Sequence, residues 1–416
     1  MWRPRWLLVL ALAPLVAGLM SPIAPRPASA APPKSPAEKA ARPPAISREA
    51  LLRGLDPRAR ALSEGRLTTA LPGARKAVLS LDPALDAFVS KLLQKNDVPH
   101  AGVVAMDPAT GRVLAYVSHG QQGVRGPDRV LDASAPAASV FKVVTATALL
   151  AEGVTPSRSV CYHGGSQRLS MGELVDNPKR DTACASLTGA LGFSINAVFG
   201  KLALQFLDPK RLARQAAAYG FGERLPFDVP TEPSVLDVPR EKLEFARTAA
   251  GFWHTSLSPL HAAAMAASIA NGGRMMRPEL VDRVVDAQGK VVYASAPALH
   301  RKVTEPRTAQ QLGIMLRATV AQGTSRRSFH DSRGRPVLPG IAVAGKTGTL
   351  SEERPYRGYT WWMGFAPADR PRIALGVLVV NSPNWRIKAS QVAAETLRHY
   401  LVDAPRAAGG SGLAQR

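Results

Sequence analysis

A serine and a lysine three residues apart are the first pair in this sequence whose types and spacing could do chemistry. Ser139 and Lys142 open an almost wholly apolar stretch that runs to Leu150, which is typical of a buried helix. Residues three apart share one face of a helix, so both side chains are expected near its N-terminus. A lysine whose pKa is lowered by burial can take the proton of a serine hydroxyl and make it a nucleophile. Taken alone, the pair is more simply explained as an ordinary helix start.

Two more short motifs follow, and each has a simple structural explanation of its own. Ser194 and Asn196 are polar residues in an apolar helical stretch, where backbone carbonyls could satisfy them. Lys346-Thr347-Gly348-Thr349 follows the apolar run 341–345. Small hydroxyl side chains beside a glycine would let a substrate backbone lie along such a strand, and the lysine would supply positive potential. An edge strand with a charge that discourages aggregation would look the same.

The elements that must position these motifs predict an α+β fold. Two β-prone runs at 101–106 and 112–117, joined by a turn-forming stretch at 107–111, predict a hairpin, and later strands are expected at 341–344, 361–366 and 373–380. Helices are expected at 85–93 and 258–271, across most of 139–270, and after the last strand. Strands at both ends with helices between them predict an antiparallel β-sheet flanked by helices, with an all-helical subdomain.

The order of the three motifs is more informative than any one of them. S-x-x-K, then S-x-N, then K-T-G is the set found in penicillin-binding proteins and class A β-lactamases. On these residues the sequence resembles the transpeptidase domain of the penicillin-binding proteins, whose fold is β-lactamase/transpeptidase-like. The likeness covers about residues 71–402 and includes the stretches 81–85, 106–115, 257–273 and 361–367.

The resemblance implies catalytic roles for three residues. Ser139 would attack the carbonyl of a D-alanyl-D-alanine stem peptide in peptidoglycan, or of a β-lactam, and form an acyl-enzyme. Lys142 would accept the serine proton, and Ser194 would relay a proton to the leaving amine. The amine of a second stem peptide would then resolve the ester and complete a cross-link. No metal or organic cofactor is implied.

The same resemblance implies binding roles for the remaining motif residues. Asn196 would hold the peptide amide, and Lys346 would support the electrostatics beside Ser194. Thr347 and Thr349, with Gly348 between them, would hold the terminal carboxylate. The backbone N–H groups of the nucleophilic serine and of Thr349 would form the oxyanion hole.

The N-terminal residues have the pattern of an export signal. Two arginines precede an apolar core at 6–20, and Ala28-Ser29-Ala30 is typical of a cleavage site, so 1–30 is predicted to be a signal peptide, with an uncleaved anchor as the alternative. The protein is therefore expected in the periplasm or cell envelope. A Pro/Ala-rich basic spacer is expected at 31–70, the catalytic domain at 71–402 and a disordered tail at 403–416.

The only two cysteines, Cys161 and Cys184, allow three interpretations. In an oxidising compartment they could form a disulfide. They could also be free buried thiols, or join His163 in a metal site, although their spacing matches no zinc pattern.

Several other functions fit parts of the sequence. A class A β-lactamase needs a deacylating glutamate after S-x-N, but the only E-x-x-x-N match, Glu173 to Asn177, precedes Ser194. Only about forty residues separate Ala30 from the domain, too few for the glycosyltransferase or pedestal domains of larger family members. A D,D-carboxypeptidase or a non-catalytic penicillin-binding sensor is therefore also considered.

The segment 340–347 also matches the phosphate-binding loop G-x-x-x-x-G-K-[ST]. That loop should lie between a strand and a helix. Gly348 and Pro355 oppose a helix after this segment, so the nucleotide-binding interpretation is disfavoured.

The charge of the chain points to anionic partners. The 53 Lys and Arg residues against 31 Asp and Glu give a net charge of +22, while the 46% hydrophobic content excludes a wholly disordered chain. Export argues against nucleic acid. The expected partners are anionic lipid headgroups or acidic wall polymers, contacted through the basic spacer, or no specific partner at all.

Overall fold

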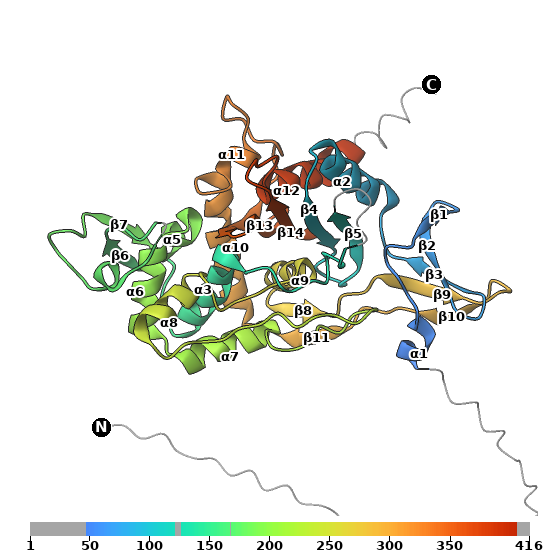
Figure 1. The fold of residues 1–416 in the computed structure, drawn as a ribbon, viewed down its shortest axis with the longest axis horizontal. Coiled ribbons are helices and arrows are strands. Elements are labelled where there is room, and N and C mark those ends of the chain that lie inside the picture. The colour runs from blue at the N-terminus through green and yellow to red at the C-terminus, as the bar shows by residue number, and fades with distance from the viewer. Residues whose placement is uncertain (1–46, 121–125, 167, 406–416) are drawn as a thin grey trace, which may run out of the picture. The chain divides into compact units, whose positions relative to one another are not determined.

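The computed structural model describes residues 47–405, apart from 121–125 and 167. Its central sheet is antiparallel, in the order β12-β13-β14-β4-β5, so strands from early and late parts of the chain lie side by side (Figure 1). These strands are β4 (His100–Met106), β5 (Val113–Gly120), β12 (Ala344–Glu353), β13 (Tyr356–Ala366) and β14 (Ile373–Asn381). The α+β prediction is confirmed, and β4 and β5 form the expected hairpin.

Helices cover both faces of this sheet because its central strands are apolar on both sides. Alternate residues of β14 divide between two cores: Leu375 packs with one set of helices, and Leu378 with another. The first set is α2 (Pro83–Lys95) and α12 (Ala389–Arg398), and the second includes α9 (Pro259–Ala270). A Cβ at Gly376 would lie 2.2 Å from the carbonyl oxygen of Pro259, so glycine lets α9 lie directly on the sheet.

The helical part of the molecule surrounds α3, in which every residue from Lys142 to Leu150 is buried. This part contains η1 (Ala138–Phe141), α3 (Lys142–Ala151), α4 (Met171–Leu174), α5 (Leu187–Phe193), α6 (Asn196–Phe206), α7 (Pro209–Tyr219), α8 (Lys242–Ala249) and α10 (Pro306–Ala321). The short helix α11 (Arg326–Phe329) follows α10 and packs against α12. A short hairpin, β6 (Ser159–Tyr162) with β7 (Ala183–Ser186), projects from it and was not expected from the sequence.

A second antiparallel sheet corrects the predicted domain boundary. It has the order β1-β2-β3-β9-β10 and follows the short helix α1. Its elements are α1 (Arg48–Leu52), β1 (Ala61–Ser63), β2 (Arg66–Leu71), β3 (Arg75–Leu79), β9 (Val281–Val285) and β10 (Val291–Ala294); a separate pair is formed by β8 (Arg274–Met276) and β11 (Leu299–Lys302).

The spacer prediction for 31–70 is therefore wrong from residue 47 onward. Pro57 and Gly65 suggested an irregular chain, but they lie at turns between short elements. Gly65, with φ of +74°, is in the β1–β2 turn. Arg48 reaches the buried carboxylate of Asp228, which ties α1 to the remainder of the molecule.

The other boundaries agree with the sequence in most places. Ser258 caps α9 as predicted, with its Oγ accepting from the backbone N–H of His261. The strand expected at 341–344 begins only at Ala344, and the helical stretch around Ser194 is broken into two helices. Residues 403–405 were expected in the disordered tail but are helical: Asp403 ends the π-helical turn η2 (His399–Asp403), and 404–405 follow it in helical conformation.

Two predicted segments, the signal peptide at 1–30 and the remaining tail at 406–416, lie outside the described residues. Within the described part of the chain, no helix is both long and apolar enough to span a bilayer.

Candidate active site

The junction of η1 and α3 positions Ser139 and Lys142. Ser139 is half-buried in η1, and Lys142, fully buried, is the first residue of α3. The Lys142 Nζ lies 2.9 Å from the Ser139 Oγ, so the S-x-x-K spacing does place both side chains together.

A tight backbone contact fixes the turn that carries the serine. Ala138 has a φ of +51°, a conformation that costs a non-glycine residue about 1 kcal/mol. Gly251, after α8, packs against it so closely that a Cβ there would lie 2.4 Å from the Ala138 carbonyl oxygen. The same loop therefore supports the serine and brings the Ala250 carbonyl beside Lys142.

The surroundings of Lys142 favour the neutral amine. Its Nζ is 2.7 Å from the Oδ1 of Asn196 and in short contact with the carbonyl oxygen of Ala250. Burial, and then the nearby positive charge of Lys346, hold the pKa of Lys142 well below its usual value. In a neutral amine the two N–H groups can go to these two oxygens, which leaves the lone pair for the proton of Ser139.

Ser194 itself has a left-handed backbone conformation, which breaks the helical stretch before Asn196. Ser194 has a φ of +60° and ends α5, while Asn196 begins α6. The break directs the two side chains to different partners. The Ser194 Oγ lies 3.1 Å from the Lys346 Nζ, whereas Asn196, only 6% exposed, contacts Lys142.

The third motif lies on β12, an edge strand of the central sheet beside η1. Lys346 is fully buried, and this burial lowers its pKa to about 7. Its Nζ also lies 2.9 Å from the Thr347 carbonyl oxygen. A Cβ at Gly348 would be 3.1 Å from that of Ala138, so the glycine lets β12 approach the serine turn. Thr349 is exposed.

The chain therefore brings its three predicted motifs together around Ser139. A comparison with known proteins gives the family of the chain. The penicillin binding protein transpeptidase domain matches residues 101–401. The chain belongs to this family.

Curated relatives of this penicillin-binding protein are similar at moderate identity. The peptidoglycan D,D-transpeptidase PbpA of Mycobacterium tuberculosis is 27% identical over 319 residues, which are 67% of this chain and 61% of the relative. The penicillin-binding protein PbpB of Mycolicibacterium smegmatis is 28% identical over 72% of this chain and 50% of its own length. The chain thus spans about half to three-fifths of the length of these relatives.

Solved structures agree with the fold. The D,D-transpeptidase domain of a peptidoglycan glycosyltransferase from Eggerthella lenta has a TM-score of 0.66 at 24% identity, covering 79% of this chain and 83% of that one. A penicillin G acyl-enzyme complex of penicillin-binding protein A from M. tuberculosis has a TM-score of 0.61 at 24% identity, covering 79% and 80%.

Three contacts at the site of this penicillin-binding protein were missed by the sequence reasoning. The Ala250 carbonyl contacts Lys142, and the Ser166 carbonyl accepts from the Asn196 Nδ2 at 3.0 Å. The Thr324 Oγ1 lies 2.5 Å from that of Thr347. Backbone oxygens leave no signal in side-chain types. Thr324 follows Gly323 at the end of α10. The glycine indicates a turn, but it does not indicate that Thr324 contacts Thr347.

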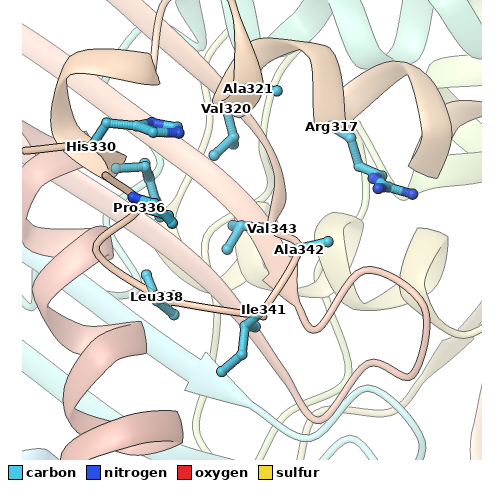
Figure 2. A pocket seen from close by; sticks show the side chains of 10 residues that line it. Arg317, Val320, Ala321, His330, Pro336, Leu338, Ile341, Ala342 and Val343 are labelled. Carbon is cyan, nitrogen blue, oxygen red and sulfur yellow. The ribbon is translucent and has the colours of Figure 1, made fainter. Parts of the chain in front are cut away.

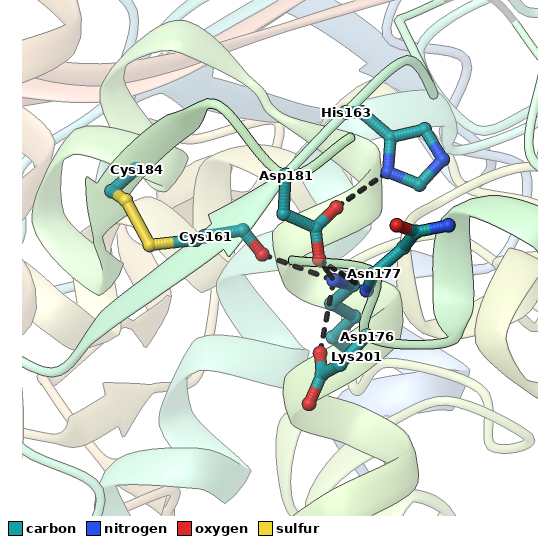
Figure 3. The surroundings of a disulfide bond; sticks show 7 residues. All are labelled: Cys161, His163, Asp176, Asn177, Asp181, Cys184 and Lys201. Atoms are coloured by element: carbon teal, nitrogen blue, oxygen red, sulfur yellow. Dashed lines mark hydrogen bonds and ion pairs between the residues drawn. A yellow bond between two sulfur atoms is a disulfide. The ribbon is translucent and has the colours of Figure 1, made fainter. Parts of the chain in front are cut away.

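The cysteines form the disulfide Cys161–Cys184, which joins β6 to β7 (Figure 3). The metal interpretation finds no support in the described part of the chain, where no group of three potential ligands gathers. The phosphate-loop interpretation is also not supported, because β12 continues to Glu353 where a helix should begin.

Figure 2 shows a separate, mainly apolar pocket. Side chains of α10, α11 and the segment before β12 line it, including Val320, Phe329, Leu338 and Ile341. None of the predicted site residues contributes to its lining.

Proposed function

We propose that this penicillin-binding protein is a serine D,D-transpeptidase that acts on D-alanyl-D-alanine stem peptides. The observation that carries the proposal is the Lys142 Nζ, 2.9 Å from the Ser139 Oγ. Burial and the nearby charge of Lys346 lower the pKa of Lys142, which favours the neutral amine that a general base needs. PbpA, named a peptidoglycan D,D-transpeptidase, supports the same activity.

In the proposed acylation, the Ser139 hydroxyl gives its proton to the Lys142 Nζ as the Oγ–carbonyl bond forms. Collapse of the tetrahedral intermediate breaks the amide bond, and D-alanine leaves after its nitrogen gains a proton. In deacylation, the amine of a second stem peptide attacks the ester, the ester bond breaks, and the serine recovers a proton. The backbone N–H groups of Ser139 and Thr349 would stabilise each oxyanion.

We also propose that Ser194 and Lys346 act together as the route of the proton to the leaving amine. Their 3.1 Å contact supports this pairing. A pKa of about 7 lets Lys346 both give and take a proton near neutral pH. The exposed Thr349 and the half-buried Thr347 would hold the substrate carboxylate.

The buried position of Asn196 modifies one sequence-based role. It was expected to hold the peptide amide, but its Oδ1 accepts from Lys142 and its Nδ2 donates to Ser166. We therefore propose that Asn196 mainly orients the lysine. Holding the peptide amide as well would require the Asn196 side chain to bind the substrate in addition to Lys142 and the Ser166 carbonyl.

We propose that the protein acts outside the cytoplasm, at the cell wall. The signal-like pattern at 1–30 and the disulfide both support export. The basic spacer offers less positive charge for anionic partners than expected. Only three of the nine basic residues at 31–75 precede residue 47, where the described fold begins. Arg48, Arg58, Arg60 and Arg66 in the folded part all have acidic partners.

The test is intact mass spectrometry with a penicillin, followed over hours. A stable adduct of the wild type that is absent from Ser139→Ala supports the proposal, and an adduct on that variant at the same rate contradicts it. Rapid return to unmodified protein would instead show a β-lactamase. With stem pentapeptide and an acceptor amine, cross-linked product supports transpeptidation, while release of D-alanine alone would show a carboxypeptidase.

A further inference from the structure

The disulfide closes a segment, residues 161–184, and Ser166, one of its described residues, contacts the candidate active site. Its Ser166 carbonyl accepts a hydrogen bond of 3.0 Å from the Asn196 Nδ2. This contact matters for chemistry because an amide has two different ends. With Nδ2 bound to a carbonyl, Oδ1 faces Lys142; if the amide were reversed, Nδ2 would donate to the lysine lone pair and compete with Ser139.

The segment lies on one face of α6, the helix that begins with Asn196. Gly165 packs against Ala197, and a Cβ at Gly200 would lie 2.5 Å from a methyl group of Leu174. Lys201 comes next along the same face. The helix that carries the site asparagine is therefore also the surface on which the segment rests.

Lys201 makes the polar attachment between helix and segment (Figure 3). Its Nζ lies 2.7 Å from Asp181 Oδ2, 3.0 Å from Asp176 Oδ1 and 3.0 Å from the Cys161 carbonyl oxygen. Its side chain and that of Asp181 are each 6% exposed, while Asp176 is 88% exposed. Asp181 also contacts His163 and accepts from the backbone N–H of Asn177.

We propose that Lys201 and Asp181 are positioning residues for acylation, acting through Asn196. By holding the segment on α6, the pair keeps the Ser166 carbonyl at the Asn196 Nδ2, and so keeps the asparagine Oδ1 at Lys142. The disulfide joins the two ends of the segment, and the ion pair attaches it to α6 at Asp181, three residues before Cys184. This inference rests on the proposed function of Ser139 and Lys142.

The experiment compares acylation by a penicillin in the wild type and in Lys201→Met, which keeps the side-chain length and removes the ammonium. Stopped-flow measurements separate the dissociation constant of the non-covalent complex from the acylation rate constant. We expect the rate constant to fall about tenfold to a hundredfold with little change in the dissociation constant, because misplacing a group that orients the base slows the chemical step. An unchanged rate constant would overturn the proposal.

A matched control distinguishes positioning from general loss of stability. Arg60→Met removes another largely buried partner of an aspartate, since Arg60 Nη2 lies 2.6 Å from Asp86 Oδ2. It should lower the melting temperature without slowing acylation. If it slows acylation as much as Lys201→Met does, the effect is one of stability and the proposal fails.

A double-mutant cycle with Asn196→Ala tests the route of the effect. If Lys201 acts through the asparagine, Lys201→Met should cause no further loss of rate once Asn196 is alanine. The same fold-change in both backgrounds would contradict the proposal. Failure of the wild type itself to acylate would overturn the proposed function, and the positioning role with it, so the two failures are distinguishable.

Discussion

Two regions of the molecule bury lysines of very different character. In the candidate active site, Lys142 and Lys346 are fully buried beside neutral oxygens, and both have lowered pKa values. In the middle of α6, burial also disfavours the ammonium of Lys201, but the hydrogen bonds that it donates to Asp181 and Asp176 outweigh this effect and raise its pKa. Burial alone therefore does not make a lysine reactive. The partner decides between a base and a structural cation.

The carboxylate side of the structural region shows the same principle. The hydrogen bond from Lys201 is the main cause that holds the pKa of Asp181 below its usual value, with help from the Asn177 backbone and His163. The pair is thus charged on both sides at neutral pH. In the candidate active site, by contrast, the partners of the two lysines are serine hydroxyls, an amide oxygen and backbone carbonyl oxygens. None of these groups carries a negative charge that would hold a proton on the lysine.

The largest expected effect follows from removing the base. Lys142→Met should slow acylation of Ser139 by a penicillin about a thousandfold, because general-base catalysis commonly contributes a factor of about 10² to 10⁴. Lys142→Arg should not restore the rate, since a guanidinium stays protonated. The rate is measured by quenched-flow mass spectrometry. A wild-type rate in either variant would exclude Lys142 as the base.

An acidic partner for Lys142 should remove the difference between this lysine and Lys201. Asn196→Asp places a carboxylate where an amide oxygen now lies 2.7 Å from the Nζ. The charge should raise the pKa of Lys142 and reduce acylation at pH 7 about a hundredfold, with the loss recovered as pH rises. The pH dependence of the acylation rate measures this effect. A profile that coincides with that of the wild type would show that the partner does not control the lysine.

Stability should respond in opposite directions in the two regions. Lys201→Met leaves Asp181, whose side chain is 6% exposed, without its ammonium, so we expect the free energy of unfolding to fall. Lys346→Met removes a buried amine that is costly to charge, so we expect a gain of about 1–3 kcal/mol at pH 7 after lost hydrogen bonds are allowed for. Urea unfolding gives both values. If both variants lost the same free energy of unfolding, Lys201 and Lys346 would not differ in their contribution to stability, and the comparison would fail.

The smallest expected effect is on the pH dependence of stability. Lys346 has a pKa of about 7 in the folded protein against 10.5 as its ordinary value, so the unfolded chain binds more protons between these limits. Its contribution should make the free energy of unfolding rise with pH across that window. Lys346→Met should reduce this slope. An unchanged slope would show that the pKa of Lys346 is not lowered in the folded protein.

Sequence reasoning succeeded where the signal is local. Ser139 and Lys142 are fixed by helical spacing, and the cap of α9 by Ser258 and the following proline. It failed where distant segments meet. The pairing of β3 with β9 joins residues near 78 and 283, and nothing in residues 47–70 indicates that partner.

The roles of polar residues were harder to predict than their presence. Asn196 was identified from its motif, but its contacts with Lys142 and the Ser166 carbonyl depend on the left-handed turn at Ser194. The raised pKa of Lys201 also could not be predicted. Its partner Asp181 belongs to the disulfide-closed segment, twenty residues earlier in the chain, and not to α6.

The most direct test follows the protonation of all three lysines in one titration. Carbon-13 NMR of the lysine side-chain methylene next to the amine reports the charge on each, with resonances assigned by the three methionine variants. The account predicts that Lys142 and Lys346 lose their protons well below pH 10.5, Lys346 near pH 7, while Lys201 stays charged beyond 10.5. If Lys142 titrates together with Lys201, it cannot serve as the neutral base at Ser139, and the central claim is contradicted.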